Sequence, residues 1–226
     1  MNFRVVIFDL DGTLLDTLAD IGNSANEVLR KLGAPEHPLA AYRDFVGSGV
    51  RVLMERILPP ELHTPEVCDK CVARFAEIYD QRWNRDSQPY AGVVSLLEEL
   101  TVRQIPMAVL SNKPQRFTEA CVAHYFGRWK FAAVVGQRDG VPRKPDPTSA
   151  LEIARQIGVA PESCLYLGDT NIDMETARSA GMYPVGAAWG FRSVTELKQS
   201  GAAAIAYHPC DVLSMLGDER PSADAR

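Results

Sequence analysis

Two carboxylates stand close together near the start of the chain, directly after an apolar run. Asp9 and Asp11 follow residues 5–8 and are separated only by Leu10. The apolar run predicts a buried strand of a parallel sheet, and side chains two apart on an extended chain point to the same side. Two like charges this close need a cation, a proton or a phosphate-handling task. A turn at Asp11-Gly12 would not account for Asp9, so we interpret the pair as catalytic.

Polar side chains also follow later apolar runs. Ser111 and Asn112 come after residues 106–110 and precede a helix predicted from Pro114. A hydroxyl and an amide beside a helix N-terminus could bind a phosphate, although a polar turn with an N-cap is the alternative. Lys144 places one ammonium in a segment, residues 143–147, that is stiffened by two prolines. Alone it could be an ordinary surface lysine.

A second acidic pair, Asp169 and Asp173, follows the apolar residues 164–167. Either Asp169 or Thr170 could simply cap the next helix. However, the carboxyl ends of parallel strands meet at one edge of a sheet, and burying these charges without a partner would be costly. We therefore predict that Asp169 shares a metal site with Asp9.

Helical and strand patterns alternate from residue 90 almost to the end of the chain. Such alternation predicts a parallel sheet with helices on both faces. We expect helices at 92–104, 114–125, 147–157 and 172–180, and strands at 106–110, 131–135, 164–167, 183–187 and 203–206.

Residues 16–86 break this alternation and read as helical throughout, with proline-rich breaks at 35–38 and 59–60. Thr17 and Asp20 have the spacing of a capping box. A helical insert that begins directly after the acidic loop would sit over it as a lid. We predict an α/β fold in which residues 1–15 and 87–226 form a Rossmann-like catalytic core with a parallel sheet, and residues 16–86 form an inserted α-helical cap.

Composition narrows the classes of function. The 226 residues are 46% hydrophobic, enough for one core with a small accessory domain. The 24 Lys and Arg against 29 Asp and Glu give a net charge of -5 without a basic cluster, which argues against a nucleic-acid partner. No apolar run approaches the roughly 20 residues of a membrane span, and no signal-peptide pattern is seen, so we expect a cytoplasmic protein. Among five cysteines, Cys68 and Cys71 lie one helical turn apart without a second pair, which favours helix packing over zinc or redox chemistry.

In this order, the motifs resemble those of the haloacid-dehalogenase-like hydrolase superfamily over essentially the whole chain. Its four motifs resemble Asp9-x-Asp11-Gly12-Thr13, Ser111, Lys144 and Gly168-Asp169-x-x-x-Asp173. The resemblance implies a Rossmann-like core with a cap inserted after the first strand. Within the superfamily, the turn Gly47-Ser48-Gly49 before an apolar-basic helix resembles the cap of phosphoglycolate phosphatases. Gly47 and Gly49 would let the backbone approach something small, so we expect this turn, together with Asn112, to contact the substrate.

Phosphate-ester hydrolysis fits these residue types. Mg²⁺ held by the carboxylates of Asp9 and Asp169, with the backbone carbonyl of Asp11, would offset the repulsion between nucleophile and phosphate. Asp9 would attack phosphorus to form an aspartyl-phosphate, and Asp11 would act as general acid and then base. Lys144 and Ser111 would stabilise phosphoryl charge, and Asp173 would orient Lys144 or metal-bound water. We expect a magnesium-dependent phosphatase that acts on a small phosphorylated metabolite, and 2-phosphoglycolate is the first candidate substrate.

Other functions stay open on these motifs. A sugar-phosphate mutase of the β-phosphoglucomutase type uses the same core, and some relatives with similar caps act on pyrophosphate. Dehalogenation is disfavoured because Asp11 supplies a second acid, and phosphonate hydrolysis because residues 46–52 lack a lysine. The presence of the whole set argues against a noncatalytic binding protein: Asp9, Asp11, Lys144 and Asp169. The oligomeric state is not determined by the sequence.

Overall fold

The computed structural model describes residues 3–216 and contains a six-stranded sheet in which every neighbouring pair of strands is parallel. The order across the sheet is β5-β4-β1-β6-β7-β8, so β1 lies in the middle. The strands are β1 (Val5–Phe8), β4 (Met107–Pro114), β5 (Ala133–Gln137), β6 (Cys164–Gly168), β7 (Tyr183–Ala187) and β8 (Ala204–Ala206). The predicted α/β class with a Rossmann-like parallel sheet is confirmed.

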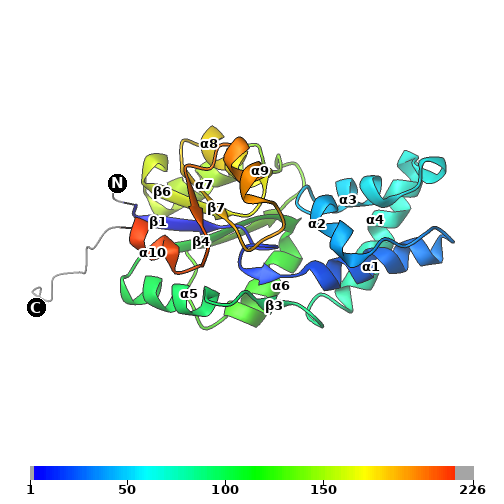
Figure 1. Ribbon diagram of the computed structural model, residues 1–226, viewed down its shortest axis with the longest axis horizontal. Coiled ribbons are helices and arrows are strands. Elements are labelled where there is room, and N and C mark those ends of the chain that lie inside the picture. Colours follow the sequence, from blue (N-terminus) through cyan, green and yellow to red (C-terminus); the bar gives the residue numbers. More distant parts are fainter. Residues whose placement is uncertain (1–2, 217–226) are drawn as a thin grey trace, which may run out of the picture.

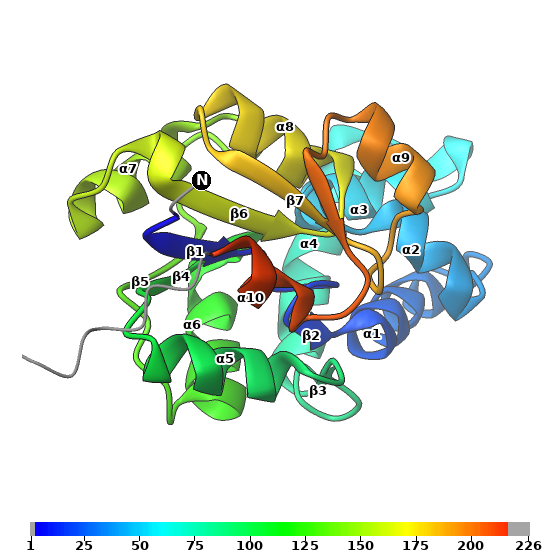
Figure 2. The same cartoon turned by 60° about the vertical axis from the view of Figure 1, so that its left-hand side comes forward.

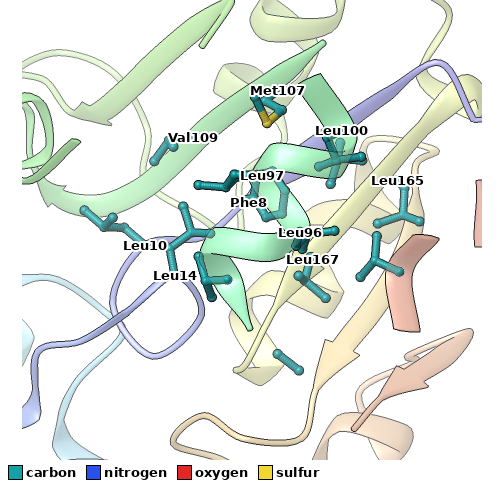
Figure 3. Packing of buried hydrophobic residues seen from close by; sticks show 14 of the residues in the cluster. Phe8, Leu10, Leu14, Leu96, Leu97, Leu100, Met107, Val109, Leu165 and Leu167 are labelled. Atoms are coloured by element: carbon teal, nitrogen blue, oxygen red, sulfur yellow. The ribbon is translucent and has the colours of Figure 1, made fainter. Parts of the chain in front are cut away.

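Helices cover both faces of the sheet (Figures 1 and 2). They are α5 (Val93–Val102), α6 (Gln115–Phe126), α7 (Thr148–Ile157), α8 (Asn171–Ser179), α9 (Val194–Gln199) and α10 (Asp211–Met215). Alternate residues of β1 point to opposite faces. Val6 and Phe8 pack with leucines of α5, as Figure 3 shows for Phe8, whereas Val5 and Ile7 pack with α7. Burial on both faces explains why the strands have continuous apolar runs.

A group of helices between β1 and α5 extends to one side of the sheet (Figure 1). These helices are α1 (Leu18–Lys31), α2 (Tyr42–Phe45), α3 (Val50–Ile57) and α4 (Pro65–Asp80), with short 3-10 turns at Leu39–Ala41 and Pro60–Leu62. We call residues 16–86 the cap. Its apolar side chains form a cluster of their own, which Phe117 and Phe191 of the core join. The domain boundaries remain a prediction, and residues 217–226 of the predicted core lie outside the described range.

Two short antiparallel strands connect the cap to the core. β2 (Leu15–Asp16) pairs with β3 (Gln88–Pro89). The buried carboxylate of Asp20 accepts hydrogen bonds from the backbone of Asp86 and from the backbone and hydroxyl of Ser87, at 2.6–3.1 Å. One carboxylate therefore ties the outgoing and returning connections together.

Two local predictions need correction. Thr17 and Asp20 do not form a capping box, because Asp20 binds residues 86 and 87, and the Thr17 hydroxyl donates to Asp11 instead of accepting from the helix. The strand predicted to end at Leu110 continues to Pro114, so Ser111 and Asn112 lie on β4 rather than in a turn.

Two further observations concern the helices. Cys68 and Cys71 are buried free thiols of α4, as expected for helix packing. Within residues 3–216, no helix is both long and apolar enough to cross a membrane.

Candidate active site

Asp9 lies at the carboxyl end of β1, between the ends of β4 and β6. It is buried, and its Oδ1 accepts a hydrogen bond of 2.9 Å from the Lys144 ammonium. Burial, with the nearby charge of Asp173, raises the pKa of Asp9 to about 7 despite Lys144. Ionising a carboxylate at this position is costly. A cation nearby, or positively charged groups around it in the transition state, would lower that cost.

Three buried carboxylates gather at this edge of the sheet. Ligand oxygens of Asp9, Asp169 and Asp173 lie within 4.8 Å of one another. Burial, followed by repulsion from Asp9 and Asp173, raises the pKa of Asp169 well above its usual range. Thr13 and the Phe191 backbone each donate to one oxygen of Asp169 at 2.8 Å. An all-oxygen, anionic set suits a hard divalent cation, so the cluster could hold a metal ion.

Lys144 connects the nucleophile candidate to Asp173. Its Nζ donates to Asp173 Oδ1 at 2.7 Å and to the carbonyl of Leu110 at 3.0 Å. Burial alone would lower the pKa of Lys144, but Asp173 and Asp9 raise it well above the usual value, so the amine stays an ammonium. The other Asp173 oxygen accepts from the backbone and hydroxyl of Thr170, in a capping box that begins α8. Asp173 thus has its oxygens engaged by protein donors, which agrees with orienting Lys144.

Ser111 and Asn112 approach Asp9 from the adjacent strand β4. The Ser111 hydroxyl accepts from the backbone of Lys113 at 3.3 Å, which leaves its own proton for another acceptor. Asn112 binds backbone on both sides of the site: its Nδ2 donates to the carbonyls of Gly47 and Lys144, and its Oδ1 accepts from the Lys144 backbone, at 2.9–3.1 Å. Asn112 therefore joins the cap turn to the lysine segment.

The surroundings of Asp11 contain two residues that the motifs did not indicate. Lys113 Nζ donates to both oxygens of Asp11, at 2.8 and 3.2 Å, and to the hydroxyl of Tyr79 in the cap at 2.7 Å. The Thr17 hydroxyl donates to Asp11 at 2.9 Å. The one available signal was that Lys113 directly follows Ser111-Asn112. Asp11 thus lies between core and cap, and accepts hydrogen bonds from Lys113 of the core and Thr17 of the cap.

A small pocket of about 50 Å³ lies between the acidic residues and the cap. Gly47 and Gly49 line it, and both adopt positive φ, 117° and 88°, which glycine tolerates best. Ser48 is directed elsewhere, since Arg56 donates to its hydroxyl and Arg143 to its carbonyl. A Cβ on Gly49 would lie 2.9 Å from the Arg143 guanidinium. The close approach at this glycine is therefore to a core arginine, and contact of the turn with a substrate stays a prediction.

Arginines further dock the cap turn on the core. Arg192 donates to the carbonyls of Asp44 and Val46 at 3.2 and 3.0 Å, and Arg43 of the cap donates back to the carbonyl of Gly190 at 3.0 Å. The cap thus closes the pocket from above the strand ends, and the site can exclude bulk water from a reacting group.

Known proteins share both this fold and this sequence pattern. A family model described as haloacid dehalogenase-like hydrolase matches residues 6–187. The phosphoglycolate phosphatase of Pseudomonas putida is 32% identical over 197 residues, covering 83% of this chain and 70% of its own. The phosphoglycolate phosphatase of Thiobacillus denitrificans is 32% identical over 204 residues, which cover 87% of this chain and 89% of its own.

Solved structures agree. A crystal structure from Lactobacillus delbrueckii subsp. bulgaricus superposes with a TM-score of 0.89 at 29% identity, over 97% of this chain and 100% of that one. A predicted phosphoglycolate phosphatase from Haemophilus somnus gives 0.88 at 25% identity, over 96% and 99%. The family model and both sequence relatives cover most of the chain, and the two solved structures cover nearly all of it. The chain belongs to the haloacid dehalogenase-like hydrolase family.

Proposed function

We propose that this protein is a phosphatase that hydrolyses a small phosphate monoester, with 2-phosphoglycolate as its preferred substrate. The observation that carries the proposal is the position of Asp9, which belongs to the acidic cluster, accepts from the Lys144 ammonium and lines the small pocket. Asp9 is thus a candidate nucleophile that lies both at a possible cation site and in a small pocket. The names of the Pseudomonas and Thiobacillus relatives support the choice of 2-phosphoglycolate.

Two steps complete the reaction. In the first, a carboxylate oxygen of Asp9 attacks phosphorus, the ester P–O bond breaks, and Asp11 gives its proton to the leaving alkoxide. In the second, water attacks the aspartyl-phosphate, Asp11 takes a proton from that water, and the bond from phosphorus to Asp9 breaks to release phosphate. Lys144 and Ser111 stabilise the phosphoryl oxygens in both steps, while Asp173 keeps Lys144 in place through their 2.7 Å contact.

Magnesium fits the donor set. The carboxylates of Asp9 and Asp169, with the backbone carbonyl of Asp11, would hold it, and Asp173 would support the site through Lys144. When bound, the ion supplies positive charge that offsets the repulsion between Asp9 and the phosphate. The raised pKa values of Asp9 and Asp169 support this assignment, because a cation relieves the cost of their ionisation.

The substrate is tested by steady-state kinetics over a panel of phosphate compounds. The panel contains 2-phosphoglycolate, pyrophosphate, β-glucose 1-phosphate and a nucleoside monophosphate, and phosphate release is measured for each. We expect the highest kcat/KM for 2-phosphoglycolate, because the pocket is small and Gly47 and Gly49 present backbone to it. Conversion of β-glucose 1-phosphate to its 6-phosphate isomer without net phosphate release would instead make the protein a mutase.

Magnesium should also stabilise the folded protein, and Asp169→Asn should remove that effect. At about 100-fold excess over Kd, we expect Mg²⁺ to raise the wild-type Tm by about 5–10 °C. In EDTA the variant should be at least as stable as the wild type, because it lacks one of three clustered carboxylates. Thermal unfolding with and without Mg²⁺ measures both effects.

The matched control is Asp139→Asn, which changes an exposed aspartate and should respond to Mg²⁺ like the wild type. EDTA should abolish activity, and Ca²⁺ should bind without supporting it, because its larger coordination shell misplaces the nucleophile. Full activity in EDTA would contradict the proposed role of the metal.

A further inference from the structure

The part of the pocket beyond the phosphate site is largely apolar. Its cap wall consists of aliphatic and aromatic side chains: Ile21, Val46, Val50, Leu53 and Phe75. Lys113 is the one basic side chain that lines this pocket within residues 3–216. An anionic group on the leaving part of a substrate would need a cation in such surroundings, and Lys113 is the group placed to provide it.

Lys113 lies next to the point where the leaving group departs. Its ammonium is 2.8 Å from Asp11, the proposed acid for the ester oxygen, and its side chain is only 4% exposed. In 2-phosphoglycolate a single methylene carbon separates the ester oxygen from the carboxylate. A carboxylate on that carbon therefore falls within reach of an ammonium that already contacts the acid.

Tyr79 completes this corner of the pocket from helix α4. Its buried hydroxyl accepts a hydrogen bond of 2.7 Å from the Lys113 ammonium. The same ammonium lies over the Tyr79 ring, 4.7 Å from the ring centroid. The hydroxyl keeps its own proton, for which residues 3–216 provide no acceptor within hydrogen-bond distance. Since Tyr79 lines the pocket, that proton is available to a substrate oxygen.

We propose that Lys113 and the Tyr79 hydroxyl recognise a carboxylate on the leaving group, and so select 2-phosphoglycolate over neutral or cationic phosphate esters. This inference rests on the proposed phosphatase function and names its specificity residues. In the first step Asp11 brings a proton to the ester oxygen, and a protonated Asp11 no longer balances the charge of Lys113. A substrate carboxylate restores that balance, whereas a methyl group does not.

The test compares two esters that differ in the carboxylate. We define the preference ratio as kcat/KM for 2-phosphoglycolate divided by kcat/KM for ethyl phosphate. Lys113→Met should lower kcat/KM for both esters, because Asp11 loses a partner. This shared loss cancels in the ratio. We expect the ratio to fall by about 10–100-fold, the scale of a hydrogen bond to a charged group. A ratio within about 2-fold of the wild type, with both rates reduced, would show that Lys113 serves only Asp11 and would overturn the proposal.

A second variant keeps the Lys113–Asp11 pair intact. Tyr79→Phe removes one oxygen, and we expect it to lower the ratio by about 3–10-fold, mainly through a higher KM for 2-phosphoglycolate. An unchanged ratio in this variant would remove Tyr79 from the recognition site. Lys130→Met is the matched control, because Lys130 is exposed and the same charge is lost there; its ratio should equal that of the wild type.

The wild-type enzyme provides a test that needs no variant. Phosphoethanolamine has an ammonium where 2-phosphoglycolate has its carboxylate, so Lys113 should repel it and kcat/KM should fall below that of ethyl phosphate. Equal turnover of these two esters would contradict the proposal. Failure of the proposed function has a different signature: phosphate release from ethyl phosphate at least as fast as from 2-phosphoglycolate in the wild type would reject the substrate whatever Lys113 does.

Discussion

Asp9→Asn is expected to abolish turnover on every phosphate ester, with a loss of kcat of about 10⁵-fold or more. The amide has the shape of the carboxylate and can still accept from Lys144, whose ammonium contacts Oδ1 at 2.9 Å, but it cannot attack phosphorus. The fold should persist, because a neutral side chain at this position avoids the burial cost and the repulsion from Asp173 that together raise the pKa of Asp9 to about 7. The measurements are phosphate release and mass spectrometry of enzyme quenched during turnover.

Wild-type enzyme should show a phosphoryl adduct that the Asp9→Asn variant lacks. Asp139→Asn is again a suitable control, since it makes the same chemical change on an exposed residue and should retain both turnover and adduct. Turnover by an Asp9→Asn preparation shown to be free of wild-type enzyme would disprove the assignment of Asp9 as nucleophile.

Asp11→Asn should fail in a different way, because it removes the proton donor but not the nucleophile. For alkyl esters such as 2-phosphoglycolate we expect a loss of about 10²–10⁴-fold, the usual contribution of a general acid or base. An aryl phosphate has a leaving group that needs little protonation. In this variant its first step should therefore proceed much faster than that of an alkyl ester. The second step still lacks its base, and the aspartyl-phosphate should therefore accumulate.

Rapid-quench measurements distinguish these effects. With the aryl ester, Asp11→Asn should release a burst of phenol close to one equivalent per enzyme, followed by slow turnover. The neutral side chain also leaves Lys113 without its anionic partner, so thermal unfolding should accompany the kinetics. Equal losses for alkyl and aryl esters, with no burst, would contradict a role for Asp11 in proton transfer.

The core and its strand ends could be predicted because their signals are local. A continuous apolar run followed by a carboxylate is visible at Asp9 and at Asp169, and the parallel sheet brings both ends to one edge. The predicted strand at 183–187 matches β7 at both ends. Strand β4 was predicted too short because Ser111, Asn112 and Lys113 are polar, and polarity indicates a turn unless the neighbouring site is known to require it.

Contacts between cap and core could not be read from the sequence. Lys113 meets Tyr79 across 34 residues and Asp11 across 102, and no periodicity encodes either pairing. Thr17 illustrates the competition between local and distant partners. Its spacing to Asp20 favours a capping box, but Thr17 donates to the partly buried Asp11, and Asp20 binds the buried Ser87 of the returning chain.

The cap leaves the core and returns to it at one place, through the paired strands β2 and β3. An insertion whose ends lie side by side can be exchanged for another without altering the path of the remaining chain, which is the situation in which domain insertion is tolerated. Asp9, Lys144 and Asp169 lie outside this insertion, whereas Tyr79 lies within it. In evolution, replacing one continuous segment would therefore exchange Tyr79 and the apolar wall of the pocket, while the phosphoryl-transfer centre and Lys113 of β4 stay in place.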